Sequence, residues 1–278
     1  MAGPRSRPRR AMLLVVGGAL ALSSAGAGTS GLAAQAATTA FIGAQDPAWA
    51  PNGTRVAVSA LDVIWTLAPD GKQATPLVTE GRAGVERDPA FSPDGALVAF
   101  AADRGAGFDI YVAPTRGGAA VPVTTQPGDE RWPSFTPDGR IVFAARALRN
   151  GRVGADPGAQ WDLQIVRPVA GSPAWQAPAP LTDTADSETY PRVSPDGALV
   201  AFVSERDADD DVDIWVMPIP AATATPVPLG PRGARPAADE APPPRPTRVV
   251  RAPGLESHLA WAPDSRRLAF HGVRNGVG

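Results

Sequence analysis

The chain has 278 residues, enough for one large domain or two small ones to bury a core, and its 32 prolines and 29 glycines favour short strands and tight turns over long helices. It contains no cysteine, which excludes disulfides, thiolate catalysis, cysteine-ligated metals and a lipidated N-terminal cysteine. The formal net charge is −2, and it becomes more negative by four if an arginine-rich leader is removed, which argues against nucleic acid as a partner.

The N-terminus has the features of a secretory signal peptide. Its first ten residues contain four arginines and no acid, and an apolar run over 11–22 follows. Small residues come next, with candidate A-x-A cleavage sites ending at Ala27 and Ala36. The alternative is an uncleaved anchor, but the apolar run is shorter than the roughly 18–20 residues that a membrane span needs. The sequence therefore predicts a leader over 1–36, export to the periplasm or the medium, and no transmembrane segment after cleavage.

One turn motif returns five times along the rest of the chain. It reads proline, any residue, a hydrophobic residue, then Ser, Thr or Ala before Pro-Asp-Gly, and its turn prolines are Pro51, Pro93, Pro137, Pro195 and Pro263. The proline fixes φ at the second position of a type I turn, and the glycine takes the left-handed position that closes it. Asn52 and Ser265 depart from the motif, and Ser265 is expected to be strained where glycine would be free.

Strand-like segments follow each turn in a fixed order. The predicted second strands lie at 56–58, 97–100, 141–143, 199–202 and 268–270. The predicted third strands open with an aspartate and lie at 62–65, 109–112, 162–165 and 213–216. A fourth strand closes each blade, as at 121–125 and, after an insertion, at 247–250. Four short strands in a period of about 40–45 residues predict an all-β propeller with four complete repeats and a partial fifth.

The repeated motif, followed by Asp-Ile/Leu-Tyr/Trp-Val, resembles the WD-like repeats of TolB-type β-propellers over nearly all of residues 41–278. The resemblance implies a six-bladed ring, of which 37–278 would be an incomplete, truncated part. Alignment of 126–132 with 252–258 makes 247–250 the fourth strand of blade four and leaves a Pro- and Ala-rich loop inserted at about 221–246. Such rings close by pairing an N-terminal strand into the last blade, and 38–42 is the expected strand. The resemblance also implies a non-catalytic binding module that holds a protein or peptide partner at the rim of the channel.

A second interpretation makes the chain the N-terminal propeller of a larger hydrolase. Propellers of this kind precede amidohydrolase domains and the α/β-hydrolase domains of prolyl-oligopeptidase relatives, so the catalytic residues would follow Gly278. Within the chain the only histidines are His258 and His271, and there is no G-x-S-x-G elbow, zinc pattern or glycine-rich phosphate loop. We therefore expect no catalytic residue and no cofactor in this chain. The sequence leaves open whether the whole protein is an enzyme, and it leaves its oligomeric state open.

Two positions of each repeat are expected to ring the mouth of the central channel. Seven residues before the turn proline stand Glu86, Glu130, Glu188 and Glu256. Five residues before it stand Asp46, Asp88, Trp132, Tyr190 and His258. These side chains could form a recognition surface. Alternatively, the glutamates could hydrogen-bond neighbouring blades and hold the ring together, because repeated positions often serve the repeat itself.

Three further features complete the prediction. The acidic segment 205–213 has Asp207, Asp209 and Asp211 as weak calcium candidates, but it lacks the glycine and terminal glutamate of an EF-hand, so we predict a solvated loop and no metal. Three arginines are expected on the top face of the propeller, which is the end where the channel mouth lies: Arg146, Arg149 and Arg152. Four tryptophans at repeat-equivalent strand positions are expected to pack between blades, namely Trp49, Trp65, Trp215 and Trp261.

Overall fold

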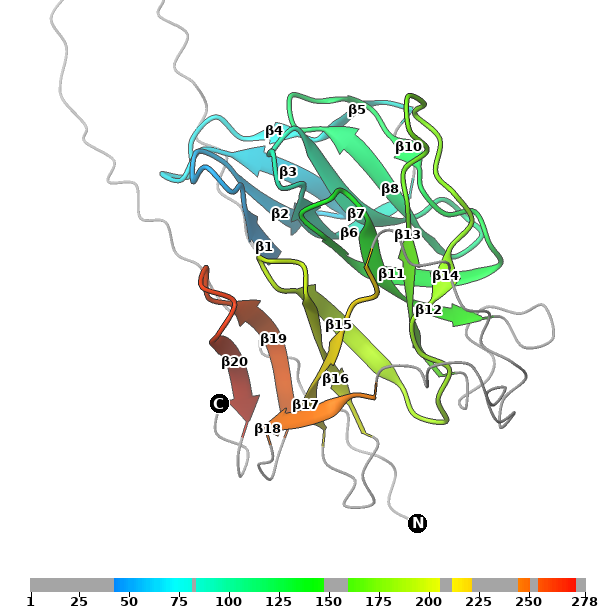
Figure 1. Cartoon of the computed structure of the whole chain (residues 1–278). Helices are drawn as coiled ribbons and strands as arrows, with labels where there is room; N and C mark the ends of the chain where they lie inside the picture. The colour runs from blue at the N-terminus through cyan, green and yellow to red at the C-terminus, as the bar shows by residue number, and fades with distance from the viewer. Residues whose placement is uncertain are drawn as a thin grey trace, which may run out of the picture.

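The structure is a computed structural model, and it describes residues 43–81, 84–147, 160–205, 212–221, 245–250 and 255–273. All regular secondary structure in these residues is β-strand, which confirms the predicted all-β class (Figure 1). The described part of the chain contains no helix of the length and hydrophobicity that membrane crossing requires.

Several predicted features lie outside the described residues. They are the leader at 1–36, the strand at 38–42, the calcium candidates Asp207, Asp209 and Asp211, the arginines Arg149 and Arg152, and the inserted loop between 222 and 244.

The described strands form four antiparallel sheets of four strands, one antiparallel pair and one parallel pair. Blade 1 contains β1 (Gln45–Trp49), β2 (Val56–Ala60), β3 (Val63–Leu67) and β4 (Thr75–Pro76). Blade 2 contains β6 (Val85–Phe91), β7 (Leu97–Asp103), β8 (Phe108–Pro114) and β10 (Val121–Pro122). Blade 3 contains β11 (Gly128–Phe135), β12 (Ile141–Ala147), β13 (Asp162–Val166) and β14 (Ala179–Pro180). Blade 4 contains β15 (Glu188–Val193), β16 (Leu199–Ser204), β17 (Asp213–Pro218) and β18 (Thr247–Val250).

The fifth unit contains β19 (Leu255–Trp261) and β20 (Leu268–Val273), and β5 (Val78–Glu80) pairs in parallel with β9 (Gly118–Ala119). Every predicted second and third strand coincides with an observed one. The segment 247–250, placed by motif alignment alone, is β18 and pairs with β17, with Arg248 opposite Trp215. The segment 121–125 is strand only at Val121–Pro122.

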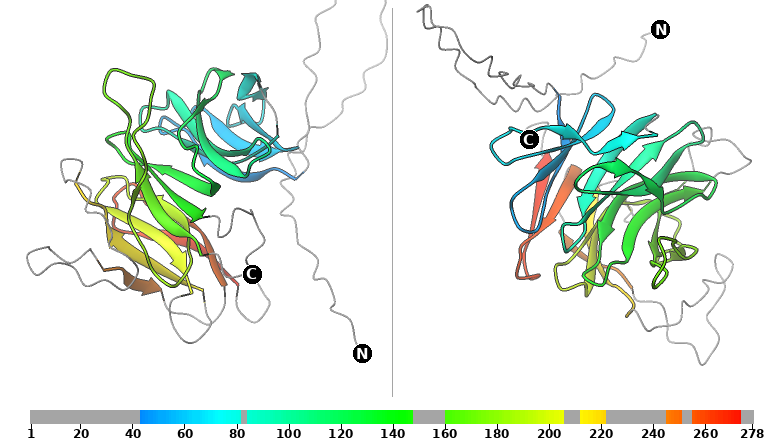
Figure 2. Two further views of the ribbon diagram at one scale, coloured as in Figure 1. Left: turned by 90° about the vertical axis from the view of Figure 1, so that its right-hand side faces the viewer. Right: turned by 90° about the horizontal axis from the view of Figure 1, so that it is seen from above.

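The blades follow one another along an arc, with their first strands toward a common axis (Figures 1 and 2). The strands β1, β6, β11, β15 and β19 contact one another in that order. Buried clusters lie between successive blades and join side chains of both: Phe100 packs with Ile64, Phe143 with Ile110, and Phe202 with Leu163. Because this apolar area is buried between blades, each blade depends on its neighbours for stability. The blade number of a closed ring stays a prediction.

The tryptophan prediction is wrong at one position. Trp261 packs on blade 4, and its indole Nε1 donates a hydrogen bond to the Arg192 carbonyl at 2.8 Å. Trp49 occupies the same repeat position in blade 1 but is 59% exposed. No described blade precedes blade 1, so Trp49 has no neighbouring sheet to pack against.

The turns adopt the predicted backbone. The glycines of the first four copies have positive φ, at Gly53 (+70°), Gly95 (+68°), Gly139 (+83°) and Gly197 (+74°). Ser265 has φ +57° in the same position, which is the expected strain. Asn52 replaces the usual aspartate without loss, because its Oδ1 accepts a hydrogen bond from the Thr54 N–H at 3.0 Å as Asp94 Oδ1 does from the Ala96 N–H at 2.9 Å.

Candidate functional site

Each innermost strand has a β-bulge at the second of the two predicted positions. The residues there have left-handed φ values between +51° and +57°, and they are Asp46, Asp88, Trp132, Tyr190 and His258. The pairing register shifts at each of these places. Non-glycine residues are uncommon in this region of φ, and bulges re-aim side chains, often next to functional sites. The same backbone irregularity therefore reorients all five predicted side chains.

Three of these side chains form an aromatic row across blades 3, 4 and the fifth unit. The ring centroids of Trp132 and Tyr190 are 4.4 Å apart, and those of Tyr190 and His258 are 6.2 Å apart. The row extends to Trp161 at 5.0 Å from Trp132 and to His271 at 6.1 Å from His258. Trp132 and Tyr190 are half-buried and His258 is exposed. The structure thus brings together side chains that are far apart in the sequence.

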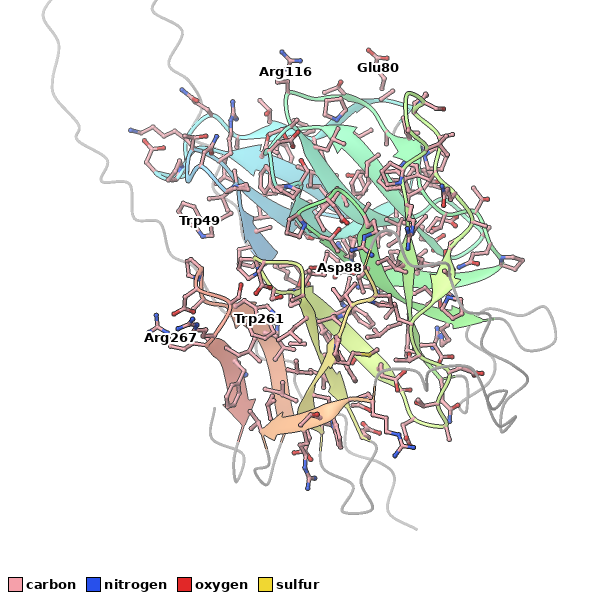
Figure 3. The ribbon with its side chains drawn as sticks, viewed as in Figure 1. Trp49, Glu80, Asp88, Arg116, Trp261 and Arg267 are labelled. Atoms are coloured by element: carbon pink, nitrogen blue, oxygen red, sulfur yellow. The ribbon has the colours of Figure 1, made fainter. Side chains whose placement is uncertain are left out.

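Charged side chains of several blades lie beside the row. Asp88, near the middle of the molecule in Figure 3, is buried and accepts a hydrogen bond from Arg131 Nε at 2.5 Å. Burial, and then the negative charge of Asp88, raise the pKa of Asp46, while Arg131, Arg192 and His258 lower it. Burial followed by the Asp88 charge also raises the pKa of Tyr190. Groups from blades 1 to 4 and the fifth unit therefore share one electrostatic environment at the axis.

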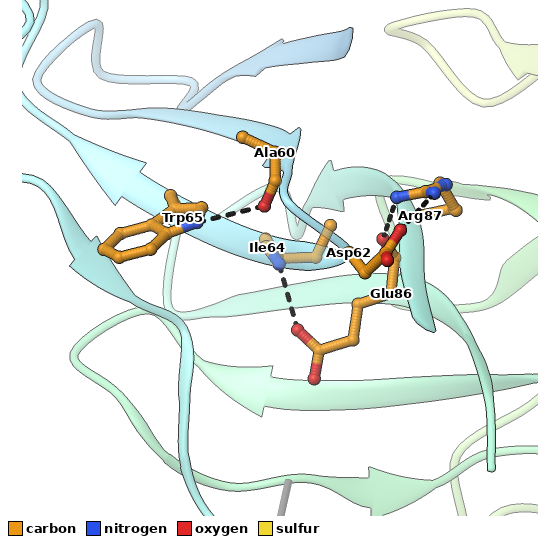
Figure 4. A network of polar contacts seen from close by, with 6 residues as sticks. All are labelled: Ala60, Asp62, Ile64, Trp65, Glu86 and Arg87. Carbon is orange, nitrogen blue, oxygen red and sulfur yellow. Dashed lines mark hydrogen bonds and ion pairs between the residues drawn. The ribbon is translucent and has the colours of Figure 1, made fainter. Parts of the chain in front are cut away.

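The glutamates at the first predicted position lie elsewhere. Glu86, Glu130 and Glu188 are at most 1% exposed. Glu86 Oε2 accepts a hydrogen bond from the Ile64 N–H of blade 1 at 2.9 Å (Figure 4). Such a contact joins one blade to a strand of the preceding blade, as expected if these glutamates hold the blades together.

A threonine hydroxyl relays the same contact between the later blades. Thr124 Oγ1 accepts from the Ile110 N–H at 2.8 Å and donates to Glu130 Oε2 at 3.1 Å. Thr182 Oγ1 likewise accepts from the Leu163 N–H at 2.8 Å and donates to Glu188 Oε2 at 2.8 Å. These three glutamates therefore belong to the interior between blades and do not line an exposed rim. The side chain of Glu256 lies outside the described residues.

Glu130 should make the stability of the fold depend on pH. Burial and then the nearby charge of Asp109 raise its pKa from 4.5 to about 8. The native state therefore retains a proton that the unfolded chain releases between these two values, so the free energy of unfolding should fall as pH rises from about 5 to about 8. Urea unfolding across this range measures the slope.

Glu130→Gln should flatten this pH profile, because glutamine cannot release the proton. Glu80→Gln, at an exposed position, is the control and should keep the wild-type slope. A Glu130→Gln protein with an unchanged slope would show that another group titrates.

A cavity of about 500 Å³ opens beside the aromatic row. Its lining includes Phe108, Asp129, Arg131, Arg146 and Trp161, together with the loop 103–107. In the sheet register Asp103 lies opposite Val85, and Ala147 lies opposite Gly128, where β6 and β11 begin. This is the predicted top face, at the opposite end of the blades from the Pro-Asp-Gly turns. The volume falls within the usual range for ligand pockets, roughly 300–1,000 Å³.

Sequence reasoning placed Arg146 on this face but missed the other lining residues, among them four with large or charged side chains. Phe108, Asp129 and Arg131 stand next to predicted strand or site positions, yet no repeat pattern marks them. Trp161 immediately precedes β13. Its ring lies 5.0 Å from that of Trp132, a contact that depends on how the strands of blade 3 are arranged in space. In the described part of the chain, no three His, Asp or Glu side chains lie together as metal ligands would.

Comparison with known proteins identifies the fold. No family model matches the chain, and no curated protein matches it either. Among solved structures, a protein assigned as TolB from Agrobacterium tumefaciens matches at 20% identity with a TM-score of 0.59, over 82% of this chain and 69% of that one. TolB from Acinetobacter baumannii matches at 21% identity with a TM-score of 0.49, over 63% of this chain and 41% of that one. At this level of identity the likeness concerns the fold, and by its fold the chain is a TolB-like β-propeller.

Proposed function

We propose that the chain is an exported, non-catalytic propeller module that binds a protein or peptide partner at the top face of its channel. The observation that carries the proposal is the row of Trp132, Tyr190 and His258, held by bulges beside the Arg131–Asp88 pair and a cavity. Tryptophan, tyrosine and arginine are the residues most enriched in binding hot spots. A rigid ring that presents them at one end is a suitable scaffold for recognition.

The alternative, in which the propeller precedes a hydrolase domain, stays a prediction. In that case the same face would gate or position a substrate for residues beyond Gly278. The two proposals differ in the ligand of the top face and agree on its location, so the binding experiment below applies to both.

Replacing Trp132 and Tyr190 together by alanine should weaken binding by about 2 kcal/mol or more, which is roughly 30-fold in Kd. The ligands are peptides selected from a random library displayed on phage against the immobilised protein. Calorimetric titration measures their Kd for the wild type and for the double variant. Trp49→Ala is the matched control, because Trp49 is an exposed tryptophan outside the row. If the control loses affinity while the double variant keeps it, the proposed site is wrong.

Export is tested separately. The arginine-rich start and the apolar run over 11–22 support cleavage after Ala27 or Ala36. Expressed with its own leader in a Gram-negative host, the protein should appear in the periplasm with its N-terminus at one of these sites. N-terminal sequencing of an uncleaved, cytoplasmic product would contradict the prediction.

A further inference from the structure

We infer that the cavity between blades 2 and 3 recognises a carboxylate group of the bound peptide. The inference rests on the proposed function and adds the chemical class that the top face selects. It depends on how two arginine side chains, Arg131 and Arg146, are held in the wall of the cavity.

The guanidinium of Arg131 lies close to two aromatic rings. Its guanidinium carbon lies 4.6 Å from the ring centroid of Phe108 and 5.1 Å from that of Trp132. Its Nε donates to Asp88 Oδ2 at 2.5 Å. No described residue accepts a hydrogen bond from its two Nη groups. The bond to Asp88 and the two ring contacts restrain the guanidinium before any ligand arrives.

Arg146 is held in the same way on the other side of the cavity. Its guanidinium carbon lies 4.9 Å from the ring centroid of Trp161, and its Nη2 donates to Asp129 Oδ2 at 2.5 Å. Asp129 Oδ1 accepts a second hydrogen bond from the Phe108 N–H at 3.1 Å, so both oxygens of this carboxylate are engaged. Within the described residues, Nε and Nη1 of Arg146 have no acceptor. Two arginines whose remaining donors meet no acceptor in the described part of the chain therefore line one cavity.

The N–H donors of the lining favour an acceptor group in the ligand. Arg131 and Arg146 carry two positive charges, and Asp103, Asp129 and the Asp88 that is bound to Arg131 carry three negative ones. Asp103 Oδ1 is already bound to the Gly105 N–H at 2.8 Å. A cation would meet N–H donors, and a doubly charged phosphate would bring two negative charges beside three carboxylates. A carboxylate carries one charge and accepts paired hydrogen bonds from guanidinium groups.

The rest of the lining indicates a peptide. Ala106, Phe108 and Trp161 give the cavity apolar walls, and its volume of about 500 Å³ exceeds what one carboxylate fills. An acidic side chain with its neighbouring residues would occupy it, and so would a peptide C-terminus. Both sources offer the same group to Arg131 and Arg146, and the test distinguishes them.

Three tetrapeptides test the inference by calorimetric titration. They are acetyl-Gly-Trp-Glu-Gly-amide, its glutamine counterpart, and the glutamine peptide with a free C-terminal carboxylate. We expect at least one carboxylate peptide to bind about tenfold more tightly than the uncharged peptide, as one charge-assisted contact would give. Preference for the glutamate peptide identifies a side-chain ligand, and preference for the free acid identifies a C-terminal one. Equal Kd values for all three peptides, or no binding of any, would overturn the inference.

Substitutions of single arginines test which side chain gives the preference for a carboxylate peptide. Arg146→Gln should abolish it, and Arg146→Lys should reduce it, because lysine keeps the charge without the planar fork. Arg267→Gln removes an exposed arginine near a bottom turn and should leave the ratio of Kd values unchanged. A preference that survives Arg146→Gln in a folded protein would also overturn the inference.

The double variant of Trp132 and Tyr190 separates this inference from the proposed function. If the three peptides bind equally and the double variant weakens all of them, the binding face stands and the carboxylate inference is wrong. If the carboxylate preference is present and the double variant changes no Kd, the cavity stands and the aromatic row is wrongly assigned.

Discussion

Replacing Glu188 by alanine should lower the free energy of unfolding by about 3 kcal/mol. Glu188 is fully buried and accepts hydrogen bonds from Thr182 Oγ1 at 2.8 Å and from Thr184 Oγ1 at 2.5 Å. Thr182 in turn accepts from the Leu163 N–H, so the substitution breaks a buried network and leaves a cavity between blades 3 and 4. Urea unfolding of the two proteins measures the loss.

The same variant decides between the two interpretations of the repeated glutamates. Glu205→Ala, at an exposed position after β16, should change stability by less than about 0.5 kcal/mol and serves as the control. If Glu188→Ala were as stable as the wild type but failed to bind the selected peptides, Glu188 would belong to a recognition surface after all. We expect the loss in stability because its carboxylate contacts other parts of the protein and not solvent.

Gly197→Ala should also lower the free energy of unfolding by about 3 kcal/mol. Gly197 has φ +74°, which strains any side chain, and an added Cβ would lie 2.7 Å from Pro137 Cδ in the turn of the preceding blade. Gly197 and Pro137 both lie in turns, so neither the added Cβ nor Pro137 Cδ can move without a shift of the backbone. Thermal or urea unfolding measures the effect.

Gly139→Ala is the matched control for this substitution. Gly139 occupies the same turn position with φ +83°, but an added Cβ would have no atom within 4 Å. Gly139→Ala should lower the free energy of unfolding by about 1 kcal/mol, and this loss would report backbone strain alone. The difference between the two variants then measures the contact between the turns of blades 3 and 4. Equal losses would show that this contact does not restrain the blades.

The strands and turns could be predicted because the repeat determines them locally. Proline and glycine select the turn type, and the apolar run after each turn has the length of a strand. Alignment of the repeats even located β18 at Thr247–Val250 beyond the insertion. The exposure of Trp49 could not be predicted in this way, because it depends on how blade 1 packs against other sheets, which the repeat motif does not specify.

The candidate site could be predicted only in part. Glu86 and Asp88 both stand near the start of the innermost strand, which lies at the top rim of a propeller, so sequence reasoning placed both at the mouth of the channel. In a regular strand, residues two apart also share a face. The left-handed φ at Asp88 interrupts that alternation, and Glu86 lies between blades while Asp88 pairs with Arg131 beside the aromatic row. The cavity could not be predicted at all, because Phe108 and Trp161 meet there from different blades.

The location of a bound peptide tests the central claim most directly. The seven tryptophans give seven indole N–H signals in NMR spectra, and a spin label on a selected peptide broadens those nearby. Trp132 and Trp161 lie at the proposed face, whereas Trp49 and Trp261 end β1 and β19 beside the Pro-Asp-Gly turns. We predict that the labelled peptide broadens the signals of Trp132 and Trp161 and leaves those of Trp49 and Trp261 sharp. Broadening of Trp49 and Trp261 with sharp signals from Trp132 and Trp161 would contradict binding at the top face.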